Sequence, residues 1–146
     1  MYFVDEFERQ LDERGRIILP TKLREQLLPK VYVTRSPSEK CLHLYSTEGF
    51  EAVSAKLRDL PSSLDKDAAA FIRMFFGGAT ECEIDKQGRI TIASRLIDYA
   101  GLKKDIVLVG ANTRMEIWDK AEWESYVDSL ENTSLTDGIL RFELNI

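Results

Sequence analysis

Two arginines stand at the same distance behind an aspartate and a glycine, once in each half of the chain. The first segment contains Asp12, Gly15 and Arg16, and the second contains Asp85, Gly88 and Arg89. A guanidinium binds a phosphate, or the O6/N7 edge of guanine, through two hydrogen bonds. Two such arginines on one face of a protein suit an anionic polymer such as double-stranded DNA. A structural interpretation also stays open, in which each arginine only pairs with a local carboxylate.

The glycine and the aspartate of each segment indicate a tight turn. Gly15 and Gly88 can take a positive φ angle at no steric cost. Asp12 and Asp85 can accept hydrogen bonds from nearby backbone amides. Because a carboxylate repels phosphates, we expect both aspartates to support the turn or the arginine instead of touching DNA.

Further basic residues flank both segments, although the chain has a net charge of −5. No acidic residue lies between positions 14 and 24 or between positions 86 and 95. We predict that Arg16 and Arg89 contact base edges or phosphates in the major groove, and that the others contact phosphates and set the orientation. These others are Arg14, Lys22, Arg24, Lys86 and Arg95.

The two segments belong to an internal repeat with an offset of 73 residues. The same offset relates residues 42–45 to 115–118, Phe50 to Trp123 and Leu57 to Leu130. Two copies are too few for a solenoid, which needs at least three stacked repeats. We therefore expect two pseudo-symmetric halves that share one core.

Each half predicts the element order ββαββα. Alternation of apolar and polar residues indicates strands, and Ser46, Asp119 and Gly101 are candidate helix caps, with Glu122 completing a capping box after Asp119. The expected strands are 7–11, 16–19, 31–35 and 41–45, and then 80–84, 89–92, 105–109 and 115–118. The expected fold class is a mixed, β-rich α+β fold: a pseudo-two-fold β-barrel of two repeats.

We expect one compact domain with four segments: a first repeat at 1–60, a linker helix at 61–78, a second repeat at 79–131 and a tail at 132–146. The linker helix, over 64–76, is apolar enough to pack on the barrel or on a neighbouring subunit. The tail alternates apolar residues, which suits an edge strand, an addition to another subunit's sheet, or disorder. These apolar residues are Ile139, Leu140, Phe142, Leu144 and Ile146.

The composition, with 44% apolar and 31% charged residues, excludes disordered and fibrous classes. Residues 1–6 form no signal peptide and no apolar run spans a membrane, so we expect a cytosolic protein. Strand alternation places His43 toward solvent, and with this one histidine we expect no His/Cys metal site. Cys41 and Cys82 are expected to be reduced and buried. Four aromatic residues at matching positions are expected in the core or in subunit contacts: Tyr45, Phe50, Trp118 and Trp123.

Together these patterns resemble the MraZ family of bacterial transcriptional regulators, which is related to the AbrB and SpoVT swapped-hairpin DNA-binding domains. The resemblance covers about residues 1–130 and rests on both Asp-x-x-Gly-Arg-Ile segments and on several shorter motifs. These are Arg73-Met74-Phe75-Phe76, Gly78-Ala79, Asp98-Tyr99-Ala100-Gly101-Leu102, Val107-Leu108-Val109-Gly110, Glu116-Ile117-Trp118 and Trp123.

The resemblance implies a compact pseudo-two-fold barrel, assembly into homo-oligomeric rings, and binding to direct repeats in the promoter of the protein's own division and cell-wall operon. It implies repression of that operon on the nucleoid, no catalytic residue, no cofactor and no small-molecule substrate. By motif match, Asp12, Arg16, Asp85 and Arg89 take the signature role.

One departure from the family pattern separates the two repeats. Pro20 and Arg24 follow the first turn, but Ala93 and Ile97 stand at the matching positions after the second. In addition, Glu13-Arg14 stands where lysine often precedes Gly-Arg. We therefore expect the second loop to contact DNA less strongly, or with altered preference.

Two alternatives from other classes remain to be weighed. A ring-forming scaffold that acts through a protein partner would tolerate removal of both turn arginines. An aspartic-peptidase dyad would also place one aspartate in each half, but here arginine follows, which would hold both carboxylates ionised and prevent the shared-proton chemistry. The chain is therefore not expected to be an enzyme.

Overall fold

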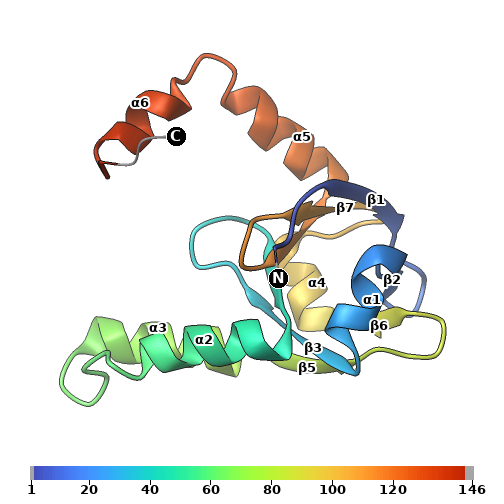
Figure 1. Ribbon diagram of the computed structural model, residues 1–146, viewed down its shortest axis with the longest axis horizontal. Coiled ribbons are helices and arrows are strands. Elements are labelled where there is room, and N and C mark those ends of the chain that lie inside the picture. The colour runs from blue at the N-terminus through green and yellow to red at the C-terminus, as the bar shows by residue number, and fades with distance from the viewer. Residues whose placement is uncertain (1, 144–146) are drawn as a thin grey trace.

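A computed structural model describes residues 2–143, in which eight strands form one six-stranded antiparallel sheet and one two-stranded ribbon (Figure 1). The strands are β1 (Glu6–Gln10), β2 (Arg16–Ile18), β3 (Lys30–Arg35), β4 (Leu42–Tyr45), β5 (Thr80–Glu83), β6 (Arg89–Thr91), β7 (Asp105–Gly110) and β8 (Met115–Asp119). The helices are α1 (Thr21–Leu27), α2 (Thr47–Leu57), α3 (Lys66–Gly77), α4 (Ser94–Ala100), α5 (Lys120–Ser129) and α6 (Leu135–Leu140). The element order ββαββα occurs twice, which confirms the predicted α+β class with two repeats.

The two repeats exchange strands. The sheet has the order β1-β7-β8-β4-β3-β5, and the ribbon pairs β2 with β6. Strands β1 and β2 of the first repeat thus pair with β7 and β6 of the second, and β5 of the second pairs with β3 of the first. Replacing each strand by its equivalent reverses the order of the sheet without changing it, as expected for pseudo-two-fold symmetry.

The predicted barrel is wrong in one respect, because no strand pairing within residues 2–143 joins the ribbon to the sheet. The turn between β1 and β2 bends the chain so that the ribbon forms a second layer over the sheet. Ile17 and Ile90 on the ribbon share one apolar core with residues of the sheet, including Val31, Ile106 and Ile117. Side-chain packing, not a closed hydrogen-bond ladder, holds the two layers together.

The offset of 73 residues fails at the third strand of each repeat. Gln10 pairs with Asp105, and Glu83, which is Gln10 shifted by 73, pairs with Lys30, so β3 and β7 differ by 75 positions. Two more residues connect α4 to β7 than α1 to β3, and two fewer connect β7 to β8 than β3 to β4. The loops absorb the slip, so inward-facing residues stay inward.

The predicted helix caps are confirmed. Ser46 accepts a hydrogen bond from the Gly49 amide at 3.0 Å, and Asp119 accepts one from the Glu122 amide at 3.3 Å. Gly101 ends α4 in the left-handed region, with φ at 60°. The Glu122 carboxylate pairs with Lys40, at 3.2 Å, and within residues 2–143 no hydrogen bond returns from it to the cap amide.

Two helical projections leave the sheet layers on one side of the molecule (Figure 1). Helices α2 and α3 lie side by side, with the Phe50 and Phe75 rings stacked at 6.2 Å. Helices α5 and α6 form the second projection. The predicted strand is wrong at Ile139 and Leu140, which belong to α6, a helix capped by Ser134. Leu144 and Ile146 lie outside the described residues. Within the described chain, every helix is too short or too polar to span a membrane.

Candidate nucleic-acid interface

The Asp12 carboxylate organises the first turn. Its Oδ1 accepts hydrogen bonds from the backbone amides of Arg14 and Arg16, both at 2.9 Å, and its Oδ2 accepts one from Arg16 Nε at 2.8 Å. Gly15 closes the turn with φ at 76°. The Arg16 amide, with help from its guanidinium, holds the pKa of Asp12 below the ordinary value, so this acceptor stays ionised at neutral pH.

The second turn repeats this geometry. Asp85 Oδ1 accepts hydrogen bonds from the amides of Gln87 at 3.0 Å and Arg89 at 2.8 Å, and Oδ2 accepts one from Arg89 Nε at 2.8 Å. Gly88 has φ at 78°. The Arg89 amide likewise lowers the pKa of Asp85. Both aspartates therefore support the turn and the arginine, as the sequence predicts.

Each arginine keeps part of its guanidinium available. The Arg16 and Arg89 side chains are 26% and 27% exposed, and within residues 2–143 no hydrogen bond engages their terminal nitrogens, Nη1 and Nη2. A carboxylate that holds Nε leaves the terminal fork for two further acceptors. The local ion pair of the structural interpretation is thus present, and it is compatible with phosphate or guanine binding.

The ribbon brings the two turns together. Arg16 pairs with Thr91 and Ile18 pairs with Arg89 in the antiparallel register, so these four side chains share the outer face while Ile17 and Ile90 face the core. Diagonal neighbours of this kind lie roughly 7–8 Å apart. The two turns lie on the side of the molecule opposite the helical projections (Figure 1).

The flanking basic residues divide into two sets. Arg14 and Lys86 are exposed within the turns, and the Arg24 guanidinium lies against Gly88. Lys22 instead lies 3.9 Å from Asp5. Arg95 donates hydrogen bonds to the Gly78 carbonyl and to Thr80 Oγ1, at 2.9 and 3.0 Å. Asp5 and Gly78 precede β1 and β5, so Lys22 and Arg95 lie at the bases of the hairpins, away from the turns.

Arg9 supports the ribbon and was missed in the sequence. Its Nε donates a hydrogen bond to the Ile18 carbonyl at 3.0 Å, and its equivalent in the second repeat, Cys82, donates through Sγ to Thr91 at 3.5 Å. A signal existed: Arg9 has the same strand parity as Phe7 and Leu11, so the pattern places a basic residue on the inward face of β1.

The aromatic residues at matching positions pack in the interior, as predicted. Trp118 and Tyr45 are buried. Trp123 contacts the Trp118 ring at 5.2 Å, and Phe50 contacts the Tyr45 ring at 5.9 Å. Both helices that follow the fourth strand of a repeat are therefore anchored to the sheet by equivalent rings.

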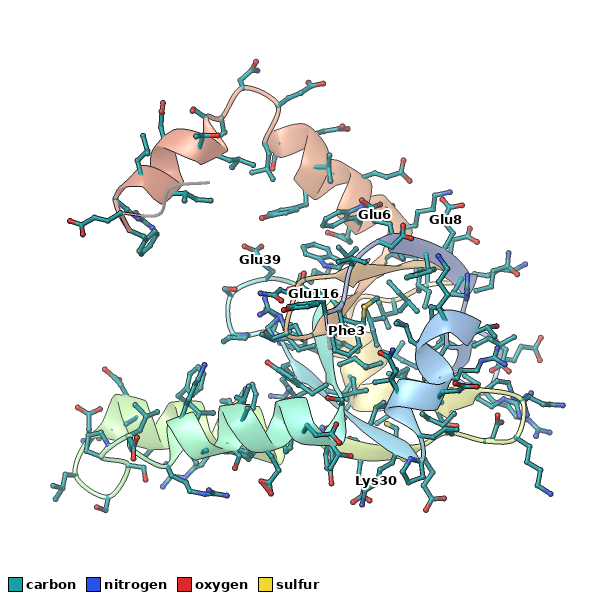
Figure 2. All side chains as sticks on the ribbon, in the orientation of Figure 1. Phe3, Glu6, Glu8, Lys30, Glu39 and Glu116 are labelled. Atoms are coloured by element: carbon teal, nitrogen blue, oxygen red, sulfur yellow. The ribbon has the colours of Figure 1, made fainter. Side chains whose placement is uncertain are left out.

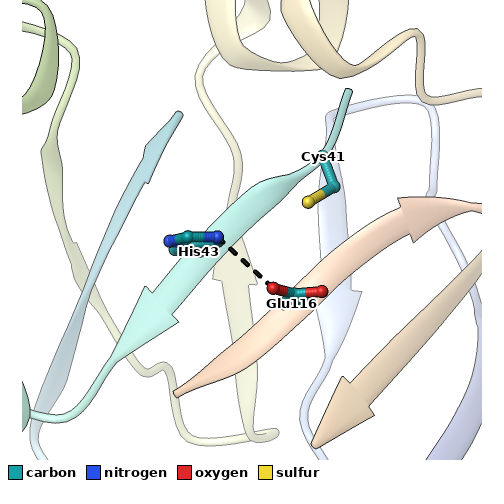
Figure 3. A group of neighbouring side chains, drawn as sticks. All are labelled: Cys41, His43 and Glu116. Carbon is teal, nitrogen blue, oxygen red and sulfur yellow. Dashed lines mark ion pairs between the residues drawn. The ribbon is translucent and has the colours of Figure 1, made fainter. Parts of the chain in front are cut away.

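His43 is buried, so the prediction that it faces solvent is wrong. Strand β4 lies in the middle of the six-stranded sheet and is covered on both faces, which removes the distinction on which alternation depends. His43 Nε2 lies 3.4 Å from the Glu116 carboxylate on β8 (Figure 3). Burial alone would raise the pKa of Glu116, but hydrogen bonds from His43, Trp118 and Arg114 lower it to about 2.

Cys41, His43 and Glu116 are the described residues that could hold a metal ion, with ligand atoms within 4.8 Å of one another. Both Glu116 oxygens, however, already accept hydrogen bonds, Oε1 from Trp118 at 3.1 Å and Oε2 from Arg114 at 2.8 Å. Burial also raises the pKa of Cys41 to about 12, which opposes the thiolate that binds metals. The geometry favours a polar network that joins β4 to β8.

Cys41 and Cys82 are both free and buried, as predicted.

Comparison with known proteins agrees with this geometry. The family model described as "MraZ protein, putative antitoxin-like" matches residues 2–73 and 75–142, one match for each repeat. Transcriptional regulator MraZ of Acetivibrio thermocellus is 49% identical over 124 residues, or 85% of each chain. Those of Moorella thermoacetica and Thermoanaerobacter sp. are each 44% identical, over 85% of both chains and over 86% and 87% respectively. The chain belongs to the MraZ family of transcriptional regulators, which are not enzymes.

Proposed function

We propose that this chain is a sequence-specific DNA-binding protein whose two Asp-x-x-Gly-Arg turns contact the major groove together. The observation that carries the proposal is the β2–β6 pairing, which sets Arg16 and Arg89 on one exposed face with their Nε atoms already held. A two-stranded ribbon fits the major groove, and the free guanidinium nitrogens match the O6/N7 edge of guanine.

The other basic residues take supporting roles in this proposal. Arg14 and Lys86 contact phosphates beside the turns, because both are exposed there. Lys22, Arg24 and Arg95 remain candidates for phosphate contact, although Lys22 and Arg95 could reach only DNA that extends past the hairpin bases. Asp12, Gly15, Asp85 and Gly88 keep the turns in shape.

A ring of subunits would supply the affinity that one acidic subunit lacks. Sites that are linked and can bind together gain about 10²–10⁴-fold over a single site. The helical projections carry exposed apolar side chains suited to contacts between copies, for example Leu64 at 90% exposed and Leu135 at 55%. We place this ring on repeated half-sites in the promoter of the protein's own division and cell-wall operon, which it represses in the cytoplasm at the nucleoid.

Fluorescence anisotropy tests the proposal with the DNA upstream of the protein's own gene, a scrambled duplex and an Arg16→Ala/Arg89→Ala variant of unchanged oligomer size. We expect a preference for the promoter, weakening with salt by about 0.9 in log K per log salt for each neutralised phosphate, and loss of binding in the variant. Equal binding by the variant would favour the scaffold function, in which the arginines are structural.

A further inference from the structure

Different side chains support the two turns, and each comes from the other repeat. The Arg24 guanidinium, on α1 of the first repeat, lies directly against Gly88 of the second turn. Ile97, at the matching position of α4, has its Cδ1 3.2 Å from where a Cβ would stand on Gly15 of the first turn. The substitution that separates the repeats in sequence therefore acts across the pseudo-two-fold axis.

Arg24 joins a closed set of contacts around the second turn. Its Nε donates a hydrogen bond to the Leu19 carbonyl at 3.0 Å, and the Leu19 amide donates one to the Gly88 carbonyl at 2.8 Å. At the first turn the Ile92 amide donates to the Gly15 carbonyl at 2.7 Å, but Ile97 has no donor to offer. The second turn is thus held by a hydrogen-bonded cation and the first by an apolar contact.

The exchange also redistributes charge. Residues 12–16 contain two carboxylates and two guanidiniums, so the first turn has no net charge. Residues 85–89 contain one carboxylate and two cations, and Arg24 adds a third cation at this turn. A phosphate backbone attracts the more positive of two otherwise equal sites.

We propose that Arg24 is a positioning residue for the second turn and that this turn, not the first, is the stronger DNA contact. The proposal rests on the proposed function, in that the turns contact DNA. It reverses the expectation from sequence, where Ile97 seemed to weaken the turn of its own repeat. Through Gly88, Arg24 fixes the neighbouring Arg89, whose amide and Nε are bonded to Asp85.

Hydrogen exchange of the free protein tests the positioning role without DNA. Peptides that cover each turn are compared between the native chain and Arg24→Ile, which gives both repeats the same residue. We expect faster exchange in the peptide with Gly88 and Arg89, and unchanged exchange in the peptide with Gly15 and Arg16. Equal change in both turns, or change in the first alone, would overturn the proposal. Arg24→Gln, which keeps an N–H donor for Leu19, replaces the isoleucine variant if that variant does not fold.

A double-mutant cycle on the promoter duplex tests the consequence for binding. We expect Arg24→Ile to weaken binding about fivefold, the worth of roughly one net hydrogen bond. The same loss is expected in an Arg16→Ala background and no further loss in an Arg89→Ala background. An equal loss in both backgrounds would show that Arg24 acts independently of the second turn, against the proposal.

The relative strength of the turns is read from the single variants, where Arg89→Ala should weaken binding more than Arg16→Ala, and the reverse order would overturn that part. If neither variant weakens binding, the proposed function fails, and hydrogen exchange still decides whether Arg24 positions the second turn.

Discussion

Asp12 and Asp85 each perform two tasks with the two oxygens of one carboxylate. One oxygen closes the turn through backbone amides and the other holds an arginine Nε. A long side chain loses rotamer freedom when it binds a ligand, which weakens association. Because the aspartates restrict Arg16 and Arg89 beforehand, part of this entropy is already lost in the free protein, which favours tight and specific contacts.

Glu116 gives a prediction for pH at the same scale. The folded protein holds the pKa of Glu116 at about 2, below the ordinary 4.5, so its contribution to stability is full above about pH 4.5 and is lost as pH falls toward 2. A depression of this size corresponds to roughly 3 kcal/mol. We expect Glu116→Gln to lower the free energy of unfolding by about this amount at pH 7 and by much less at pH 3.

Urea unfolding at both pH values measures the difference, with Glu124→Gln on the exposed face of α5 as the control. A loss of stability in Glu116→Gln that is the same at pH 7 and pH 3 would contradict the ion network around His43.

The ribbon shows how one short element can serve the core and the surface. In β2, Ile17 is 1% exposed and Ile18 is 46% exposed, because successive residues of a strand point to opposite faces. Ile90 in β6 is buried opposite Ile17. The same hydrogen-bonded pair of strands therefore anchors the ribbon to the sheet and presents the outer face to a ligand.

Ile17 and Ile18 are a matched pair that separates these two tasks. We expect Ile17→Ala to lower the free energy of unfolding by about 2–5 kcal/mol, since it leaves a cavity in the core. Ile18→Ala should change it by no more than about 0.5 kcal/mol and should weaken promoter binding, because its side chain lies between the two arginines. Chemical unfolding and anisotropy measure the two effects, and similar stability losses in both variants would contradict the assigned faces.

At the scale of the whole molecule, strand exchange makes the repeats interdependent. Neither β1 nor β2 has a pairing partner in its own repeat, and β5 and β6 likewise pair across to the first. The exchange also fixes the polarity of the molecule, with both turns on one side and the helical projections on the other (Figure 2). A surface for DNA and a surface for other subunits are thereby kept apart, which suits a ring on DNA.

We therefore expect residues 1–60 alone to be unfolded, because β1 and β2 would lack their partners. Circular dichroism of the fragment should show little regular structure, while the full chain unfolds in one cooperative transition. Mixing the fragment with residues 61–146 should restore the native spectrum. A fragment that folds alone would show that the repeats are separate domains instead of one.

Local signals in the sequence determined the turns and the helix ends. Gly15 and Gly88 take the positive φ angles, and Ser46, Asp119 and Gly101 cap their helices as predicted, because such features depend on residues within one turn of the chain. The repeat likewise predicted the duplicated element order. Arg9 was missed because a bonding partner on another strand, Ile18, gives its side chain a role.

Only the tertiary structure decided which strand pairs with which, and with that which side chain supports which turn. Arg24 and Ile97 look in sequence like supports of their own repeats, but strand exchange carries each across the pseudo-two-fold axis. His43 follows the same logic: its alternation is local, whereas its burial depends on the strands on either side of β4. Distant contacts are set by packing of the shared core, and no window of neighbouring residues contains that information.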